Sequence, residues 1–234
     1  KANISEVPPE DKMEAAVARV QSLGSMAKLA SKAGHLDLSN QSLNDLEGAA
    51  LVWAVALSCG PKLTEISLGR NRVGNRTATV MAQFLRFNKS LVTVDFDNNA
   101  LGDAAASALG KALSCNATLQ TLRLPRNDIS LTGATAILEG VTRNHELRDL
   151  VMEISGGTMS PGIHIPPLKG LAPADTIDLS SRNFGPMSAA IVAGLIERYR
   201  PQLVSLAIDK NGILTEGAHH FAEMLKSNDD IKTL

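Results

Sequence analysis

Residues 91–101 read LVTVDFDNNAL, and the same spacing of apolar residues and asparagine returns in residues 119–129, LQTLRLPRNDI. Residues 203–213, LVSLAIDKNGI, repeat it again. After Ala33 the chain restarts this pattern every 27 to 30 residues, at Leu63, Leu91, Leu119, Leu147, Ala174 and Leu203. A fixed period of this length is typical of a solenoid, in which each unit buries its apolar side against its neighbours.

Each unit predicts a short strand followed by a helix. Val94 and Phe96 alternate with polar residues, which is the period of a half-buried strand. Residues 103–114 are rich in alanine and predict a compact helix that packs closely on its neighbours. We expect further helices after Thr77, Thr132, Pro186 and Thr215. The sequence therefore predicts an α/β solenoid over residues 33–234, with about seven units and the start of an eighth at Ile231. Parallel strands should line its concave face and helices its convex face.

Two sets of asparagines recur at fixed positions in the units. Those that follow the strands can bind turn backbone through their side-chain amides, and they are Asn71, Asn99, Asn127 and Asn211. Asn88 and Asn116 stand where helices should end, and each opens an Asn-x-Ser/Thr sequence. We interpret both as helix caps in the left-handed conformation rather than as glycosylation sites.

The unit that begins at Leu147 departs from the pattern. Leu150 and Met152 keep the apolar positions of a strand, but residues 155–173 hold four prolines where a helix should run. Proline inside a helix costs about 3 kcal/mol, so we expect an irregular, non-helical insert with few apolar anchors. Two interpretations stay open: a loop that contacts a partner, or a tolerated surface irregularity.

Residues 1–32 precede the repeats and predict an N-terminal segment with a capping helix. Pro8 and Pro9 suit a helix start. An apolar stripe follows at three- and four-residue spacing: Met13, Val17, Val20, Leu23, Ala27 and Ala30. The first unit of an array has no neighbour of its own, so we expect this helix to cover it. The basic face of a membrane-surface helix is diluted here by Glu10, Asp11 and Glu14.

Composition argues against several classes of function. The net charge of −1 lacks the basic excess of a nucleic-acid-binding protein. The longest apolar stretch, Ala49–Cys59, is too short to cross a bilayer. Cys59 and Cys115 lie two units apart, beyond disulfide reach, and we expect buried thiols in a reducing compartment. These features predict a cytoplasmic protein without direct membrane insertion.

Residues 88–113, NKSLVTVDFDNNALGDAAASALGKAL, and residues 116–138, NATLQTLRLPRNDISLTGATAIL, carry a resemblance to known proteins. With one helix in each repeat, the chain resembles the ribonuclease-inhibitor class of leucine-rich repeat proteins. Within that class, residues 63–154 are most similar to the actin-regulatory proteins CARMIL and tropomodulin. The resemblance implies a horseshoe-shaped scaffold, a protein partner and a place in a cytoskeletal assembly.

Charge is distributed unevenly over the strands. The second, fourth and sixth residues after the first apolar position of each unit should face the concave side, because they alternate with core positions. These positions carry eight acids: Asp37, Glu65, Asp95, Asp97, Asp149, Glu153, Asp178 and Asp209. Arg123 is the one base among them, and the next position is often basic, as at Arg126. Like charges on adjacent strands should repel, so we predict that these ten residues bind a protein with a basic surface.

No pattern of residues predicts catalysis, a cofactor or a metal site. His219 and His220 are adjacent on a helix and point in different directions, and neither cysteine lies in a nucleophile motif. The sequence therefore favours a non-enzymatic interaction module. Two alternatives stay open. One is the sensor region of a larger NOD-like receptor, and the other is a GTPase-activating protein of the RanGAP type. The candidate arginines for the latter are Arg70, Arg72, Arg76 and Arg126.

Overall fold

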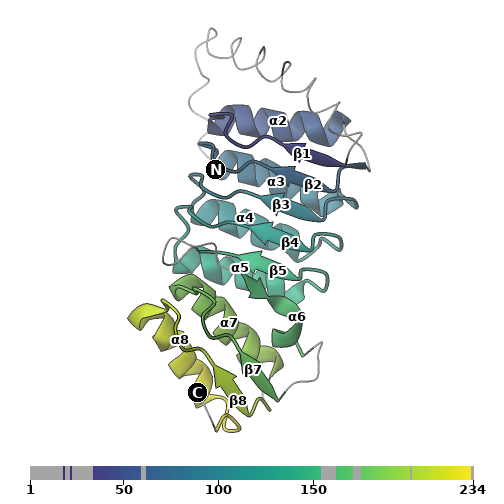
Figure 1. The fold of residues 1–234 in the computed structure, drawn as a ribbon. Helices are drawn as coiled ribbons and strands as arrows, with labels where there is room; N and C mark the ends of the chain where they lie inside the picture. Colours follow the sequence, from purple (N-terminus) through teal and green to yellow (C-terminus); the bar gives the residue numbers. More distant parts are fainter. Residues whose placement is uncertain are drawn as a thin grey trace, which may run out of the picture.

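Strands and helices alternate along one continuous stack in the computed structural model (Figure 1). The structure describes Ala18, Ser22 and residues 34–58, 62–153, 162–170, 175–200 and 202–232. The strands are β1 (His35–Asp37), β2 (Glu65–Ser67), β3 (Thr93–Asp95), β4 (Thr121–Arg123), β5 (Asp149–Val151), β6 (Ile163–His164), β7 (Thr176–Asp178) and β8 (Ser205–Ala207). The helices are α2 (Asp45–Ser58), α3 (Asn75–Phe87), α4 (Asp103–Leu113), α5 (Leu131–Arg143), α6 (Ile165–Leu168), α7 (Pro186–Tyr199) and α8 (Leu214–Lys226). Strands line one side of the stack and helices the other, which confirms the predicted α/β solenoid.

The repeat spacing sets the register of the strands. β1 to β5 form one parallel sheet, in which each residue pairs with its counterpart one unit later, as Ile66 does with Val94 and Val94 with Leu122. The middle residue of each strand is buried against the helices. A second buried row follows the strands: Leu38, Leu68, Phe96, Leu124 and Met152. The core positions predicted from the alternating pattern are therefore confirmed.

Small residues set the distance between neighbouring helices. A Cβ atom added to Gly140 in α5 would lie 2.1 Å from the carbonyl oxygen of Gly110 in α4. A Cβ added to Gly110 would lie 2.2 Å from the Ala136 carbonyl oxygen. The two helices thus touch backbone to backbone, and no side chain fits between them at these points.

Asparagine side chains connect consecutive units where the strands end, as the sequence predicts. The Asn99 side chain donates to the carbonyls of Phe96 in its own unit and Leu68 in the preceding one, at 3.1 and 2.9 Å. Its oxygen accepts from the Val73 N–H at 3.1 Å. Equivalent bonds are formed by Asn71, Asn127 and Asn211. One side-chain amide thereby forms hydrogen bonds with backbone groups of two units, at positions where the chain has left the sheet.

A second row of asparagines follows the helices, and its geometry differs from the prediction. Asn88 lies at φ −72° and ψ 137°, which is extended rather than left-handed. Its side-chain oxygen accepts from the N–H groups of Ser90 and Leu91, so it stabilises the turn toward the next strand. The Asn116 amide donates to the carbonyls of Leu85 and Asn88 in the preceding unit. The structural role is confirmed, but the left-handed conformation was wrong, because the chain must extend here to return to the sheet.

A third row of cross-unit bonds holds the helix N-termini. Asp45 at the start of α2 accepts three backbone N–H groups at the start of α3, at 2.8 to 3.0 Å. Asn75 and Asp103 accept equivalent N–H groups from the units that follow them. An oxygen at this position satisfies N–H groups without an intrahelical partner, and a carboxylate also stabilises the positive end of the helix dipole.

The fifth unit contains more structure than the predicted non-helical insert. β6 pairs antiparallel with β5, and α6 forms one helical turn with Pro166 and Pro167 in its first positions. Proline is tolerated there because the first N–H groups of a helix have no intrahelical partner. Ile163, Ile165 and Leu168 are buried. For residues 162–170, the expectations of no helix and few apolar anchors were therefore wrong.

The parallel sheet also stops at this unit. β7 and β8 form a separate two-stranded parallel sheet. Helix packing continues across the break, where the Tyr199 hydroxyl in α7 donates to the Thr142 carbonyl in α5. The Lys169 ammonium donates to the Asn144 carbonyl, a role that an asparagine amide fills in earlier units. Burial of this ammonium lowers the pKa of Lys169.

Several predictions fall on residues outside the described part of the chain. These are the capping helix of residues 1–32 apart from Ala18 and Ser22, Cys59, and residues 154–161 and 171–174. Cys115 is exposed rather than buried, and it lies directly after Ser114, which ends α4. Among the described residues, no helix combines the length and apolar character needed to cross a membrane.

Leu124→Ala tests the repeat register. Leu124 is 1% exposed and packs between the sheet and the helices, so the truncation leaves a cavity. We expect a loss of about 2–5 kcal/mol in the free energy of unfolding, measured by chemical denaturation. Thr121→Ala, on the outward face of β4, should change it by less than about 0.5 kcal/mol. A neutral Leu124→Ala would mean that the register is wrong.

Asp45→Asn tests the helix N-terminal bonds through their pH dependence. Burial alone raises the pKa of Asp45, but hydrogen bonds from Thr77, Gly74 and Arg76 outweigh it and hold the pKa below its ordinary value of 3.8. The folded state therefore binds fewer protons than the unfolded state, so this contribution is present above pH 3.8 and is lost as pH falls below it.

Denaturation at a series of pH values should show a shallower acid loss for Asp45→Asn than for the wild type. Asp229→Asn changes an exposed acid near the end of the described chain and serves as the matched control. Equal acid sensitivity of wild type and Asp45→Asn would contradict the assignment of Asp45 as a cross-unit cap.

Candidate functional site

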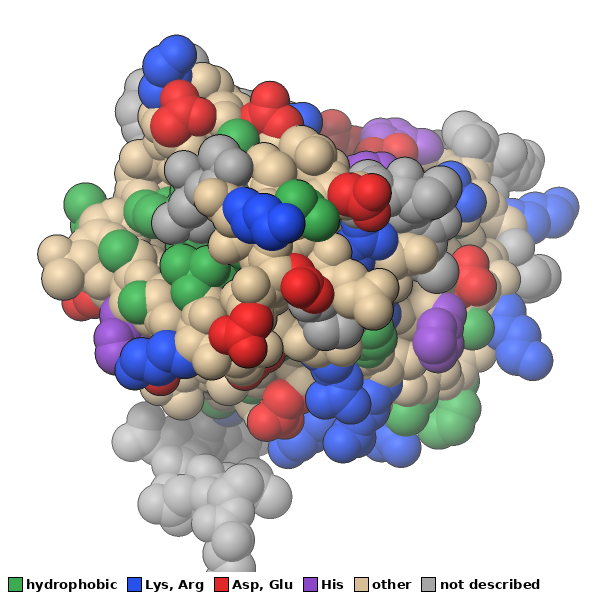
Figure 2. Space-filling view, turned by 90° about the horizontal axis from the view of Figure 1, so that it is seen from below, with side chains coloured by type: hydrophobic (Ala, Val, Ile, Leu, Met, Phe, Trp, Pro, Cys, Tyr) green, Lys and Arg blue, Asp and Glu red, His purple; other side chains and the backbone are tan. Residues whose placement is uncertain are grey.

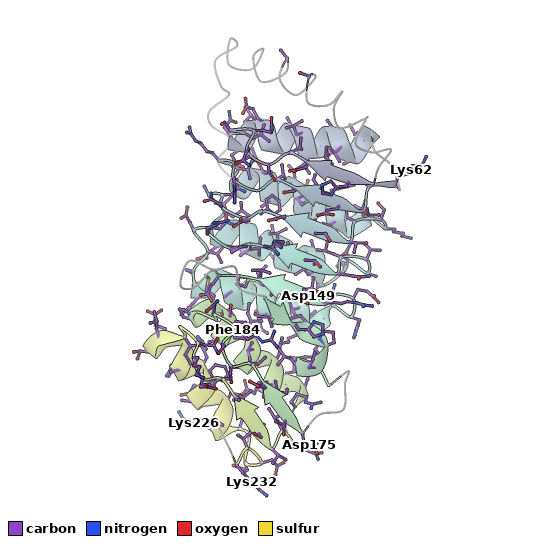
Figure 3. The ribbon with its side chains drawn as sticks, viewed as in Figure 1. Lys62, Asp149, Asp175, Phe184, Lys226 and Lys232 are labelled. Carbon is purple, nitrogen blue, oxygen red and sulfur yellow. The ribbon has the colours of Figure 1, made fainter. Side chains whose placement is uncertain are left out.

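The side of the first sheet that faces away from the helices presents a row of polar side chains. We call it the open sheet face, and its strand residues are His35, Asp37, Glu65, Ser67, Thr93, Asp95, Thr121, Arg123 and Asp149. The alternation of a strand places these residues outward because their neighbours fill the core. Asp149 on β5 lies near the centre of the stack (Figure 3).

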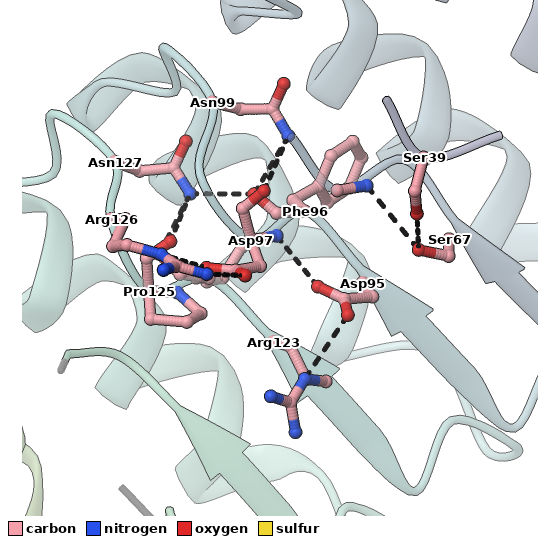
Figure 4. Close-up of polar contacts among 12 residues, drawn as sticks. Ser39, Ser67, Asp95, Phe96, Asp97, Asn99, Arg123, Pro125, Arg126 and Asn127 are labelled. Atoms are coloured by element: carbon pink, nitrogen blue, oxygen red, sulfur yellow. Dashed lines mark hydrogen bonds and ion pairs between the residues drawn. The ribbon is translucent and has the colours of Figure 1, made fainter. Parts of the chain in front are cut away.

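Two ion pairs form the middle of the open sheet face (Figure 4). The Arg123 guanidinium on β4 lies 3.3 Å from the Asp95 carboxylate on β3. Arg126 donates from Nε to Asp97 Oδ1 at 2.8 Å and from a second nitrogen to Asp97 Oδ2. The Asp97 N–H in turn donates to Asp95 at 2.7 Å, which joins the pairs into one network. We call these four residues the central cluster.

The electrostatics of the central cluster follow from its partial burial. Burial raises the pKa of Asp95, and the Asp97 N–H and the Arg123 charge oppose this without cancelling it. The hydrogen bond to Asp97 raises the pKa of Arg126. Asp97 is only 8% exposed, so its carboxylate is largely enclosed by the arginine that binds it. A bidentate pair of this kind is among the stronger charged contacts in proteins.

The strand register of the first sheet places no two acids directly opposite one another on adjacent strands, which corrects the expected cross-strand repulsion. The strand register places Asp95 beside Ser67 on one side and Arg123 on the other. Glu65 pairs across strands with His35 at 2.9 Å, and Asp149 pairs with His164 at 2.9 Å. Neither His35 nor His164 was predicted as the partner of an acid. His35 stands directly opposite Glu65 in the parallel register, whereas His164 arrives on the antiparallel strand that was not predicted.

The remaining acids lie nearer the ends of the array. Asp37 is exposed and accepts the Ser39 N–H, and hydrogen bonds from Ser39 lower its pKa. Asp178 on β7 accepts the Ser180 N–H in the same way. Asp209 accepts the Ser180 hydroxyl across the second sheet. Seen from the C-terminal end, side chains of both charge signs are intermixed (Figure 2).

Glu153 is the clearest correction among the predicted site residues. Its carboxylate accepts the N–H groups of Gly185, Met187 and Ser188 at 2.8 to 3.0 Å, and so it caps α7. For α3, α4 and α5 a residue at the start of the preceding helix fills this role, but α6, which precedes α7, has one turn only. Glu153 therefore points away from the open sheet face and supplies the missing cap.

The basic residues that follow the strands share an unusual backbone conformation. Arg70, Arg126 and Lys210 each have φ of 56°, in the left-handed region that side chains other than glycine and asparagine seldom adopt. Asn40 and Asn98 occupy the same turn position in other units, with φ of 57° and 54°. The turn thus imposes the same conformation on each of these units. Arg126, a candidate catalytic arginine, is held by Asp97.

A comparison with known protein families agrees with the repeat architecture. A family model described as Leucine Rich repeat matches residues 87–110 and 115–138. Among solved structures, actin-binding site 2 of leiomodin-1 is similar, with a TM-score of 0.47 and 16% identity. That match covers 56% of this chain and 79% of the leiomodin-1 chain. No curated protein matches the sequence.

Glu153→Ala separates a capping role from a surface role. Removing the carboxylate leaves three N–H groups of α7 without their acceptor, and we expect a loss of about 1–2 kcal/mol in the free energy of unfolding. Asp149→Ala removes a nearby acid from an exposed pair and should cost less than about 1 kcal/mol. Hydrogen exchange should speed up in the first turn of α7 for Glu153→Ala only. Equal behaviour of the two variants would refute the capping assignment.

Proposed function

This chain is a leucine-rich repeat protein, and we propose that it is a protein-interaction module whose open sheet face binds a partner with a basic surface. Repeat arrays leave one extended face free of core packing, and such a face suits the binding of another macromolecule. The observation that carries the proposal is the composition of this face. Asp37, Glu65, Asp95 and Asp149 lie on its strands against one arginine, Arg123.

The central cluster and its neighbours have different roles in this proposal. Asp97 is enclosed by Arg126 and acts on the partner only by fixing the position of the arginine. Glu65 and Asp149 flank the cluster, and their side chains are 43% and 44% exposed. Each has a histidine partner that is itself about half exposed, so a lysine or arginine of the partner can approach the same carboxylate. We assign direct contact to these two acids and to Asp37.

Surface ion pairs add little to affinity by themselves, because solvent screens them. Their summed field nevertheless raises the rate at which an oppositely charged partner arrives, and that gain falls with ionic strength. The proposed module therefore gains its specificity from the fixed spacing of carboxylates along the sheet. Actin is the first partner to test, because the sequence resembles actin-regulatory repeat proteins.

The experiment removes two exposed carboxylates without breaking the central cluster. The double variant Glu65→Gln, Asp149→Asn is compared with wild type for association with actin and with proteins captured by the wild-type chain. At low ionic strength the association rate constant should fall by roughly threefold or more, and the difference should shrink near 0.15 M salt. Unfolding free energy should change by less than about 1 kcal/mol.

Glu139→Gln with Glu216→Gln is the matched control, because it removes the same charge from the exposed surfaces of α5 and α8. Its association rate should stay closer to that of wild type. If both double variants slow association equally, net charge rather than the open sheet face governs binding. If neither does, the partner contacts another surface and the proposal is rejected.

A further inference from the structure

The break between the two parallel sheets leaves one edge of β7 without a neighbouring strand. In the described part of the chain, β7 pairs with β8 only. The strand at the same place in the preceding unit is bonded on this edge. The Asp149 N–H of β5 donates to the Gln120 carbonyl at 3.0 Å, and the Val151 carbonyl accepts the Leu124 N–H at 2.7 Å. The edge of β7 that faces the fifth unit therefore lacks bonds that a regular unit forms.

Thr176 and Asp178 stand at the positions on β7 that carry these bonds in β5. Alternate residues of a parallel strand direct their backbone groups to opposite edges. β7 bonds β8 through the Asp175 carbonyl and the Leu179 N–H, so the backbone groups of Thr176 and Asp178 face the break. Both residues are exposed. Backbone groups of this kind on a strand edge are a template for another extended chain.

A cavity of about 200 Å³ lies beside this edge, between β6 and β7. Its walls include Leu168 of α6, which lies between β5 and β7 in the stack (Figure 1), and Ile177 and Leu179 from β7 and the turn after it. These three side chains are buried. Small-molecule sites usually occupy roughly 300–1,000 Å³, so this volume favours a single apolar side chain as the occupant.

The outward side of the same edge carries an acid. Neighbouring residues of an added strand would point alternately into the cavity and outward, beside Thr176 and Asp178. The Asp178 carboxylate accepts the Ser180 N–H at 2.9 Å. Within the described residues it forms no ion pair, although Arg182 also lines the cavity. Opposite charges on adjacent strands attract, so the outward position beside Asp178 favours a lysine or an arginine.

We propose that β7 binds an extended segment of a partner protein in which apolar and basic residues alternate. The segment adds a strand at the break and bonds the backbone of Thr176 and Asp178. One apolar side chain fills the cavity, and a lysine or arginine meets the Asp178 carboxylate. This site goes beyond the function proposed above, because it lies on the edge of the second sheet rather than on the open sheet face.

The test titrates the peptide acetyl-Lys-Val-Lys-Val-Lys-amide into the isotope-labelled protein and follows backbone amides by NMR. The Thr176 and Asp178 amide resonances should shift along a saturable curve. At saturation, exchange of the Thr176 N–H with solvent should slow by about tenfold or more, because a hydrogen-bonded amide must open before it exchanges. The same peptide methylated at every backbone nitrogen keeps its side chains but cannot pair as a strand, and it should not bind.

Thr176→Pro removes one of the proposed bonds and blocks the edge. Proline is tolerated at an edge position whose N–H is not used in the sheet, so β7 should still pair with β8. The peptide should bind this variant about tenfold more weakly or worse. Thr176→Val keeps the N–H and should bind as the wild type does. Unchanged amide resonances in β8 would show that Thr176→Pro is folded.

Asp178→Asn tests the basic position of the segment and should weaken binding by roughly threefold. Asp37→Asn is its matched control, because Asp37 is an exposed acid that accepts the Ser39 N–H in the same way on β1. The control should bind the peptide as the wild type does. Equal loss in both variants would mean that net charge attracts the peptide, and the assignment of Asp178 would be overturned.

Four results would overturn the strand pairing itself. One is the absence of a saturable shift at millimolar peptide, and two others are equal binding by Thr176→Pro and equal binding of the methylated peptide. The fourth is protection of the Thr176 N–H in wild type without peptide. Protection at every protein concentration would show that the chain covers its own edge, and protection that grows with concentration would show that a second copy does.

Discussion

The parallel strands β1 to β5, β7 and β8 are three residues long, and the backbone groups of the turns that follow them must find hydrogen-bond partners. In four units an asparagine at the exit of the strand meets this demand for its own unit and for the preceding one, as Asn99 does. Because the amide bonds two units at once, a unit with its amide in place also positions its neighbour. The strand register, the buried rows and the outward-facing side chains all depend on this connection.

The fifth unit shows what the array needs when the repeat pattern fails. With α6 reduced to one turn, the N-terminus of α7 lacks the capping residue that a full helix supplies. Glu153 provides it from the loop after β5, and Lys169 binds the Asn144 carbonyl where an amide stood in earlier units. Lys169 does work that asparagine does in earlier units, and Glu153 does work that Asp45, Asn75 and Asp103 do there. The helix layer stays continuous while the sheet divides in two, so the break changes the surface more than the core.

Charged residues on the open sheet face have two roles, which are pairing with one another and the proposed contact with a partner. Counting acids and bases in the sequence does not separate these roles. Asp97 and Arg126 are bound to one another and help to hold adjacent turns together, while Glu65 and Asp149 remain half exposed in pairs with histidine. Parallel register decides which acid meets which base, since it places each residue beside its counterpart one unit away. The acidic character of the face therefore coexists with internal pairing, and in the proposed function the acids at the margins of the central cluster contact the partner.

The sequence by itself determined the solenoid, the strand and helix of each regular unit, the buried rows through Val94 and Leu124, and the asparagine bonds between turns. These follow from local spacing that recurs, so each unit predicts the next. Only the tertiary structure decided the direction of Glu153, the antiparallel β6 and the pairing of Asp149 with His164. Each of these depends on residues that lie distant in sequence, such as the N-terminus of α7 for Glu153. A periodic pattern carries no information about such contacts, because they occur where the period is broken or between units whose side chains differ.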